Sequence, residues 1–269
     1  MSLFSVYLKK VRGSGKRFFT LDQAMKDLNL KRNAVLTSVY RAKKRGDLIS
    51  PARGLYVIVP PEHQGYGCIP PEELIPILMD YMKADYYVAL LSAAAYHGAA
   101  HQKAASFQII SDKRFTKPLK FGRVSIECVY KKFIKNVPIK NITVSTGYLK
   151  IATPEVVVMD LFYYVAKSGG LNHIATVLSE LMEIVDPDKL WMLAESSKEK
   201  SWVQRLGFIL EKIEFMNDDL VKIVIDKLKE SLAKHRLCYI PLASEMPIQD
   251  CKRNKQWNII ENTIIESDL

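Results

Sequence analysis

The 269-residue chain has few of the residues that build disulfide frameworks, metal sites or membrane spans. Its four cysteines (Cys68, Cys128, Cys238 and Cys251) form no CxxC pair, so we expect reduced thiols and no zinc site. No run of about 18 apolar residues occurs, which predicts no transmembrane helix. The first residues show no cleavage-site pattern, so we expect no secretory signal. We expect a cytoplasmic location instead.

Catalytic motifs are also missing. There is no GxSxG sequence, and Glu127 lacks the acidic-x-Lys spacing of nuclease sites. His97 and His101 have the i, i+4 spacing of helical metal ligands, but Gly98 occupies the position where zincins have a glutamate. We expect packing or hydrogen bonding for these histidines, and helix capping or a buried hydrogen bond for Asp160. We therefore predict no catalytic residue, no metal site and no cofactor.

Acidic residues are scarce in the first part of the chain. Residues 1–60 contain 13 Lys and Arg but only 3 Asp and no Glu, a net charge of +10. The whole chain has 39 basic and 29 acidic residues, so residues 61–269 contain 26 of each. All of the net charge therefore lies in one short segment, as expected for a surface that binds nucleic acid phosphate.

The same segment has the pattern of a winged helix-turn-helix. Thr20 followed by Gln23 is a capping box, and apolar spacing predicts a helix over 21–28 and a second over 31–45, with Ala34, Val35, Val39 and Ala42 inward. Residues 48–49 and 55–59 predict two strands around a turn. In this motif the second helix enters the DNA major groove, and the turn between the strands lies beside the backbone or minor groove.

The predicted interface follows from this motif. We expect bases to be contacted by Arg32, Asn33, Thr37 and Ser38, because Asn pairs with adenine and Arg with guanine. We expect phosphate to be bound by Lys16, Arg17, Lys43, Lys44 and Arg45. Lys31 and Arg41 belong to the same outward face, and Arg53 lies in the wing turn. The predicted partner is double-stranded DNA.

The rest of the chain predicts a larger second domain. A Pro- and Gly-rich stretch marks a linker at 61–70, between a DNA-binding domain at 1–60 and a domain at 71–269. Strands are predicted at 107–110, 124–129, 142–144, 148–151, 237–240 and 257–265. Helices are predicted at 72–83, 86–98 (capped by Asp85), 154–167 (capped by Thr153), 172–185, 187–196, 201–215 and 219–234. The predicted fold class is α+β: a winged helix-turn-helix, then a larger mixed α/β domain with a helical second half.

Several stretches of the sequence resemble one protein family. They follow one another along the chain in the same order as in that family. They are RGLYVIVPPEH, YYVALLSAAAYHGAAHQ with the following FQII, TPEVVVMDLFYY with GGLNHIATVLSEL, RLGFILE and WNIIENTIIESD. Together they resemble the AbiEi-type antitoxins, the transcriptional-regulator half of bacterial AbiE (type IV) toxin–antitoxin systems of abortive phage infection. The resemblance covers nearly the full length.

This resemblance implies an autorepressor that binds inverted repeats in its own promoter. It implies a C-terminal domain that counteracts a co-encoded nucleotidyltransferase-like toxin, and it maps DNA contacts onto Lys31, Arg32, Asn33, Thr37, Ser38, Arg41 and Arg53. Two alternatives remain open at this stage. One is an ordinary winged-helix regulator whose C-terminal domain senses a ligand, and the other is a nuclease that the N-terminal domain targets to DNA.

Overall fold

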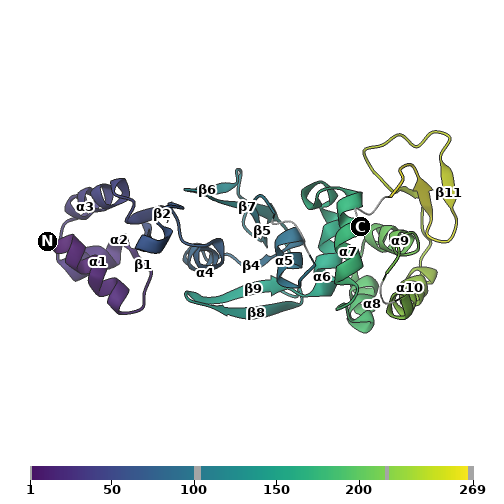
Figure 1. The fold of residues 1–269 in the computed structure, drawn as a ribbon, viewed down its shortest axis with the longest axis horizontal. Coiled ribbons are helices and arrows are strands. Elements are labelled where there is room, and N and C mark those ends of the chain that lie inside the picture. Colours follow the sequence, from purple (N-terminus) through teal and green to yellow (C-terminus); the bar gives the residue numbers. More distant parts are fainter. Residues whose placement is uncertain (1, 100–103, 216–217, 266–269) are drawn as a thin grey trace. The chain divides into compact units, whose positions relative to one another are not determined.

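The computed structural model describes residues 2–99, 104–215 and 218–265. It contains helices and three separate sheets, which confirms a mixed α+β fold (Figure 1). Its contacts divide the chain into two compact units. The first consists of 1–87, 105–136 and 141–151, and the second of 88–104, 137–140 and 152–269. The predicted division at 61–70 stays a prediction, since packing contacts do not show which parts act independently.

The N-terminal segment, residues 2–60, has three helices and a small antiparallel sheet. Its elements are α1 (Leu3–Gly13), β1 (Phe18–Thr20), α2 (Leu21–Leu28), α3 (Arg32–Lys44), β2 (Leu48–Ala52) and β3 (Leu55–Ile58). The strand order is β1-β3-β2, and both neighbouring pairs are antiparallel. The two helices and two strands predicted after Thr20 are confirmed, whereas β1 was not predicted.

Aromatic rings hold this segment together. Phe19 is 2% exposed, and its ring centroid lies 5.4 Å from that of Tyr7 and 5.5 Å from that of Tyr56. α1 adds Phe4, Leu8 and Val11, and α3 adds Val35, Val39 and Ala42 to the same core. One expectation was wrong: Ala34 is exposed, because the inward stripe of α3 begins at Val35.

The predicted capping box starts α2. The Thr20 side chain accepts a hydrogen bond from the Gln23 N–H at 3.2 Å, and Gln23 Oε1 accepts one from the Thr20 N–H at 3.0 Å. At the other end, Asn29 has φ 50°, a left-handed conformation that Asn tolerates. This arrangement fixes both ends of an eight-residue helix.

Loss of this cap has a measurable cost. We expect Thr20→Ala to lower the free energy of unfolding by about 1 kcal/mol, because it leaves first-turn N–H groups without a partner. Urea denaturation would measure the change. Thr20→Ser keeps the hydroxyl and should stay close to the wild type; equal losses in both variants would show that the hydrogen bond is not the cause.

A six-stranded sheet forms the middle of the chain. Its order is β6-β7-β5-β4-β9-β8. The strands are β4 (Tyr86–Val88), β5 (Phe107–Ser111), β6 (Leu119–Phe121), β7 (Val124–Tyr130), β8 (Ile139–Val144) and β9 (Gly147–Ala152). β5 and β7 are parallel, and β6 is antiparallel to β7. The prediction included β5, β7, β8 and β9 but missed the two short strands β4 and β6.

The predicted helix over 86–98 was partly wrong. Residues 86–88 are the buried strand β4, and the helix α5 is confined to Leu90–Tyr96. Aromatic and β-branched residues fit a pleated sheet well, so the Tyr-Tyr-Val sequence joins the sheet rather than the Ala-rich helix. Asp85 does not cap α5: its carboxylate lies 3.7 Å from the Lys150 ammonium.

The remaining helices are η1 (Pro61–His63), α4 (Pro71–Met82), α6 (Pro154–Tyr163), η2 (Val165–Ser168), α7 (Leu171–Leu181), α8 (Pro187–Ser196), α9 (Ser201–Leu210) and α10 (Asp218–Ala233). The α-helices among them start within one residue of their predicted starts, but α6 and α9 end at Tyr163 and Leu210 rather than at 167 and 215, and the short helix η1 was not predicted. Thr153 precedes α6 but makes no side-chain cap. In the described ranges, no helix has the length and apolarity needed to cross a membrane.

A small sheet follows the helices. It joins β10 (Ile240–Pro241) in parallel, and β11 (Lys252–Asn254) antiparallel, to β12 (Ile259–Glu261). The strand predicted over 257–265 is shorter than expected. The Trp257 N–H donates to Asn254 Oδ1 at 3.0 Å, and Asn258 has φ 50°, so these residues form a turn before β12.

Candidate nucleic-acid interface

One face of α3 is polar, basic and open to solvent. Val35 and Val39 point into the core and are 0% and 3% exposed, which turns the other side of the helix outward. The predicted contact residues of this face are exposed except for half-buried Ser38: Lys31, Arg32, Asn33, Thr37, Ser38, Arg41, Lys43 and Lys44. We call this set the α3 face. It brings together most of the predicted interface.

The start of α3 is suited to bind an anion. The N-cap residue is Lys31, no side chain caps the helix, and the first turn holds no acidic residue. Uncapped N–H groups and the helix dipole make a helix N-terminus favourable for phosphate. Arg32 and Asn33, the first two residues of the helix, add a cation and an amide at this end.

Two hydroxyls of the α3 face already donate their protons. Thr37 Oγ1 donates to the Asn33 carbonyl at 2.9 Å, and Ser38 Oγ donates to the Ala34 carbonyl at 3.0 Å. While these bonds persist, each oxygen can only accept a further hydrogen bond. The structure thus leaves Thr37 and Ser38 as acceptors, which match amino groups of cytosine or adenine better than carbonyls.

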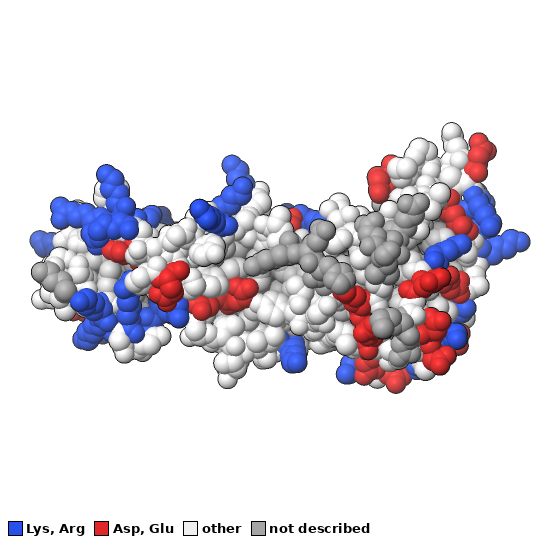
Figure 2. All heavy atoms as spheres, viewed as in Figure 1, with Lys and Arg blue, Asp and Glu red and all other residues white. Residues whose placement is uncertain are grey.

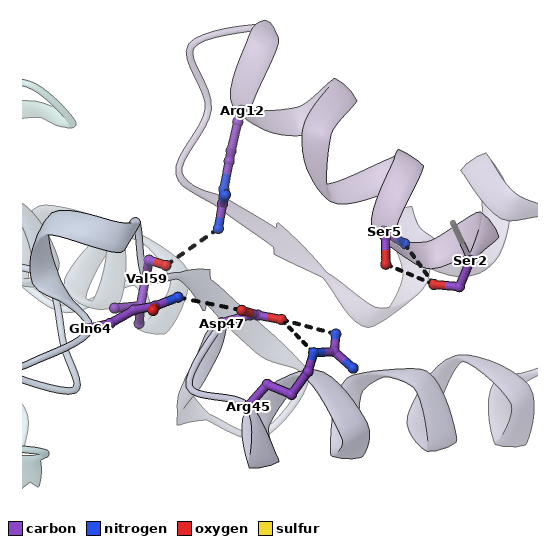
Figure 3. A network of polar contacts seen from close by, with 7 residues as sticks. All are labelled: Ser2, Ser5, Arg12, Arg45, Asp47, Val59 and Gln64. Carbon is purple, nitrogen blue, oxygen red and sulfur yellow. Dashed lines mark hydrogen bonds and ion pairs between the residues drawn. The ribbon is translucent and has the colours of Figure 1, made fainter.

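Two predicted phosphate ligands are engaged in ion pairs. Arg45 Nε and Nη2 both lie 2.9 Å from Asp47 Oδ2, and Gln64 Nε2 donates to the other oxygen of Asp47 at 3.5 Å (Figure 3). Arg17 Nη1 lies 3.0 Å from Glu73 Oε2. Sequence reasoning missed both pairs. Lys16, by contrast, is exposed and shares an open cavity of 390 Å³ with Arg17.

The turn between β2 and β3 is held at its backbone. The Tyr81 hydroxyl donates to the Arg53 carbonyl at 2.8 Å, and the Leu21 N–H donates to the Gly54 carbonyl at 2.9 Å. Gly54 has φ 83°, a conformation that favours glycine. These contacts fix the turn and leave the Arg53 side chain exposed at its tip.

Positive charge predominates in the N-terminal segment. In Figure 2, Lys and Arg are dense over the region that Figure 1 labels α1 to α3. Asp47 is occupied by Arg45, which leaves Asp22 and Asp27 as the other acids of this segment. A double helix carries closely spaced negative phosphates, so this positive surface is complementary to it in charge.

Other polar residues have structural roles. A ring nitrogen of His97 lies 2.7 Å from the Ala152 carbonyl, which confirms a hydrogen-bonding role for His97, whereas His101 lies outside the described residues. Asp160 is fully buried. Phe162 is 3% exposed, and the Tyr163 hydroxyl lies 3.0 Å from Ser197 Oγ. In the described part of the chain, His, Cys, Asp and Glu form no group able to hold a metal ion.

Comparison with known proteins finds a family match in the second part of the chain. Residues 87–212, from within β4 to just beyond α9, match the AbiEi antitoxin C-terminal domain family. No curated protein matches the sequence. The RV2827C protein of Mycobacterium tuberculosis has a similar crystal structure: its TM-score is 0.67 at 14% identity, over 95% of this chain and 90% of that one. This similarity shows a shared fold.

A second solved structure is less similar. It is an antigenic nucleotidyltransferase-like protein from Paracoccidioides brasiliensis, with a TM-score of 0.39 at 12% identity, over 57% of this chain and 91% of that one. A score this low does not indicate a shared fold. The family match, in contrast, includes three of the stretches in which the sequence resembles the antitoxins, apart from Tyr86 at the start of the first. Residues 87–212 of this chain therefore form a domain of the AbiEi antitoxin family.

Proposed function

We propose that this protein is the cytoplasmic antitoxin of a bacterial type IV toxin–antitoxin system and the repressor of its own operon. The match of residues 87–212 to the antitoxin family carries the first part of this proposal. The exposed basic α3 face carries the second. The partners are double-stranded operator DNA, with inverted repeats in the protein's own promoter, and a co-encoded nucleotidyltransferase-like toxin.

In this proposal, residues 2–60 act as a winged helix-turn-helix. Support comes from the succession of α2, a turn at Asn29, α3 and the β2–β3 hairpin. α3 would enter the major groove with its N-terminal residues toward the bases, as in other proteins with this motif. Arg53 would then contact the backbone or minor groove from the tip of the hairpin.

The contacts divide into base reading and phosphate binding. Arg32 and Asn33 stand at the uncapped start of α3, where side chains reach base edges. Lys16, Lys43 and Lys44 would bind phosphate. Arg17 and Arg45 would also bind phosphate, but each must first leave its ion pair, with Glu73 and Asp47 respectively. Breaking that ion pair offsets part of the free energy that phosphate binding provides. The antitoxin domain acts by countering the toxin rather than by catalysis.

Two substitutions distinguish these roles. We expect Asn33→Ala to weaken operator binding by about 1–3 kcal/mol, the range of one base contact, with little effect on random DNA. Lys44→Ala should weaken both kinds of DNA alike and reduce the slope of log K against log salt by about 0.9, the value for one phosphate contact. Fluorescence anisotropy with promoter and scrambled duplexes at several salt concentrations measures both effects.

A matched control is Lys198→Ala, which removes one exposed positive charge in the antitoxin domain. Its salt slope should equal that of the wild type. Equal losses on promoter and scrambled DNA for Asn33→Ala would contradict base reading by this residue. Failure of the wild type to prefer its promoter would contradict the repressor function itself.

A further inference from the structure

A second basic segment lies outside residues 2–60. Residues 112–135 contain eight Lys and Arg but only Asp112 and Glu127 as acids. The neutral total of residues 61–269 conceals this cluster, because acidic residues elsewhere balance it. Figure 2 shows a second group of Lys and Arg over the region that Figure 1 labels β6 and β7.

The exposed cations of this segment differ from the cations of the C-terminal helices, because they form no ion pair with a described acidic residue. Lys227 pairs with Asp188 at 2.7 Å, Lys229 pairs with Glu211 at 3.0 Å, and Lys189, Lys222 and Lys234 are also in ion pairs. In 112–135 seven basic residues are exposed, and none forms an ion pair with any described residue. They are Lys113, Arg114, Lys117, Lys120, Arg123, Lys132 and Lys135.

The sheet brings two parts of this segment together. β5 and β7 are parallel neighbours, and Ser111 at the end of β5 is paired with Tyr130 at the end of β7. The Lys131 N–H donates to the Ser111 carbonyl at 3.0 Å, so the loops that follow the two strands start side by side. Together they make the strand-end cluster, which consists of Lys113, Arg114, Tyr130, Lys132, Phe133 and Lys135.

Aromatic rings lie among the cations of this cluster. The Arg114 guanidinium lies 4.4 Å from the centroid of the Tyr130 ring, and the Lys132 ammonium lies 5.1 Å from that of Phe133. Phe133 is 79% exposed, although its neighbour Ile134 is buried at 6%. The buried Ile134 side chain holds this loop against the protein. Phe133 is therefore exposed on a loop that is packed in place.

We propose that the strand-end cluster binds single-stranded nucleic acid, separately from the α3 face. Lys113, Lys132 and Lys135 would bind consecutive phosphates, and an unpaired base would stack on the Phe133 ring. Aromatic rings between cations are typical of single-strand surfaces, where every base offers a face for stacking. A duplex hides these faces, so an exposed Phe would add nothing to its binding. An acidic protein would use the cations but would not need the ring.

The test uses the full-length chain and labelled oligonucleotides of about 12 nucleotides, within the range of single-strand sites. RNA, DNA of the same sequence and the corresponding duplex are compared by fluorescence anisotropy. We expect Phe133→Ala to weaken single-strand binding about 10-fold and to leave binding to the promoter duplex unchanged. A preference for RNA over DNA would identify the 2′-hydroxyl as part of the recognised chemistry.

The phosphate contacts have their own readout. Lys132→Ala/Lys135→Ala should make the salt slope for single strands shallower by about 1.4, since each phosphate contact contributes about 0.7. Lys198→Ala/Lys255→Ala removes the same charge from exposed positions elsewhere and should change nothing.

Three results would overturn the proposal. One is an equal loss of single-strand binding in the control Lys198→Ala/Lys255→Ala. Another is unchanged single-strand binding in Phe133→Ala. The third is loss of single-strand binding in Arg32→Ala/Arg41→Ala, which would place that binding on the α3 face. Because Phe133 is exposed, its removal should leave the melting temperature near that of the wild type. If the wild-type protein does not bind its promoter, the proposed repressor function is refuted, whereas the proposal of single-strand binding still stands.

Discussion

Replacing Trp257 with alanine is expected to lower the free energy of unfolding by about 3–5 kcal/mol, the usual cost of removing a buried Trp. Trp257 is 0% exposed, and its Nε1 donates to Glu211 Oε2 at 2.8 Å. It lies against α9 at Gly207, where an added Cβ would overlap the ring. The substitution would leave a large cavity and remove a partner of Glu211.

The measurement is urea denaturation, with Tyr148→Ala as the control for loss of an aromatic ring. Tyr148 is 67% exposed, so its removal should change stability by less than about 0.5 kcal/mol. Gly207→Ala should also destabilise the protein, because the new methyl group meets the same ring. Wild-type stability in both Trp257→Ala and Gly207→Ala would contradict this packing.

Trp257→Phe tests the hydrogen bond and its dependence on pH. Burial opposes ionisation of Glu211, but hydrogen bonds from Trp257 and Lys229 outweigh it and hold the pKa of this carboxyl below its ordinary value. A lowered carboxyl pKa stabilises the folded state above the ordinary pKa, and this contribution is lost as pH falls through the lowered one. The difference between wild type and Trp257→Phe should therefore shrink toward acidic pH.

The second large effect concerns the α3 face. We expect Arg32→Ala/Arg41→Ala/Lys44→Ala to weaken promoter binding at least about 100-fold, because it removes two arginines that can contact bases or phosphates and one further cation. All three side chains are exposed, so folding should be preserved. In cells carrying a promoter reporter, repression should be lost. The same variant should still neutralise the toxin, because the antitoxin domain begins at residue 87.

The control is Lys198→Ala/Lys252→Ala/Lys255→Ala, which removes three exposed positive charges from the second compact unit. It should repress the reporter as the wild type does. Full repression by the α3-face variant would show that DNA is bound elsewhere. Loss of both repression and toxin neutralisation, with an unchanged melting temperature, would show that the two activities share one surface.

Local patterns predicted the N-terminal segment well. The capping box at Thr20, the left-handed Asn29 and Gly46 after α3 are short-range signals, and the helices begin and end where these signals predict. α8, Pro187–Ser196, was also predicted correctly. In contrast, all three residues of β4 are buried, so they lack the alternation that marks a strand and appeared continuous with the Ala-rich helix.

Long-range contacts could not be predicted in this way. Arg17 looked like a free phosphate ligand because Glu73, its partner, is 56 positions further along the chain. The strand-end cluster was missed for a different reason. Its positive charge disappears in the neutral sum of residues 61–269, and only the parallel pairing of β5 and β7 brings Arg114 beside Tyr130.

The most direct test of the antitoxin function is growth. The product of the adjacent gene is expressed under induction, alone or with the full-length protein, and with the α3-face variant as the form that does not repress. We predict that the adjacent product arrests growth and that both forms of this protein restore it. Continued arrest with both forms, when each is present at normal levels and folded, would contradict the antitoxin function and leave a DNA-binding regulator.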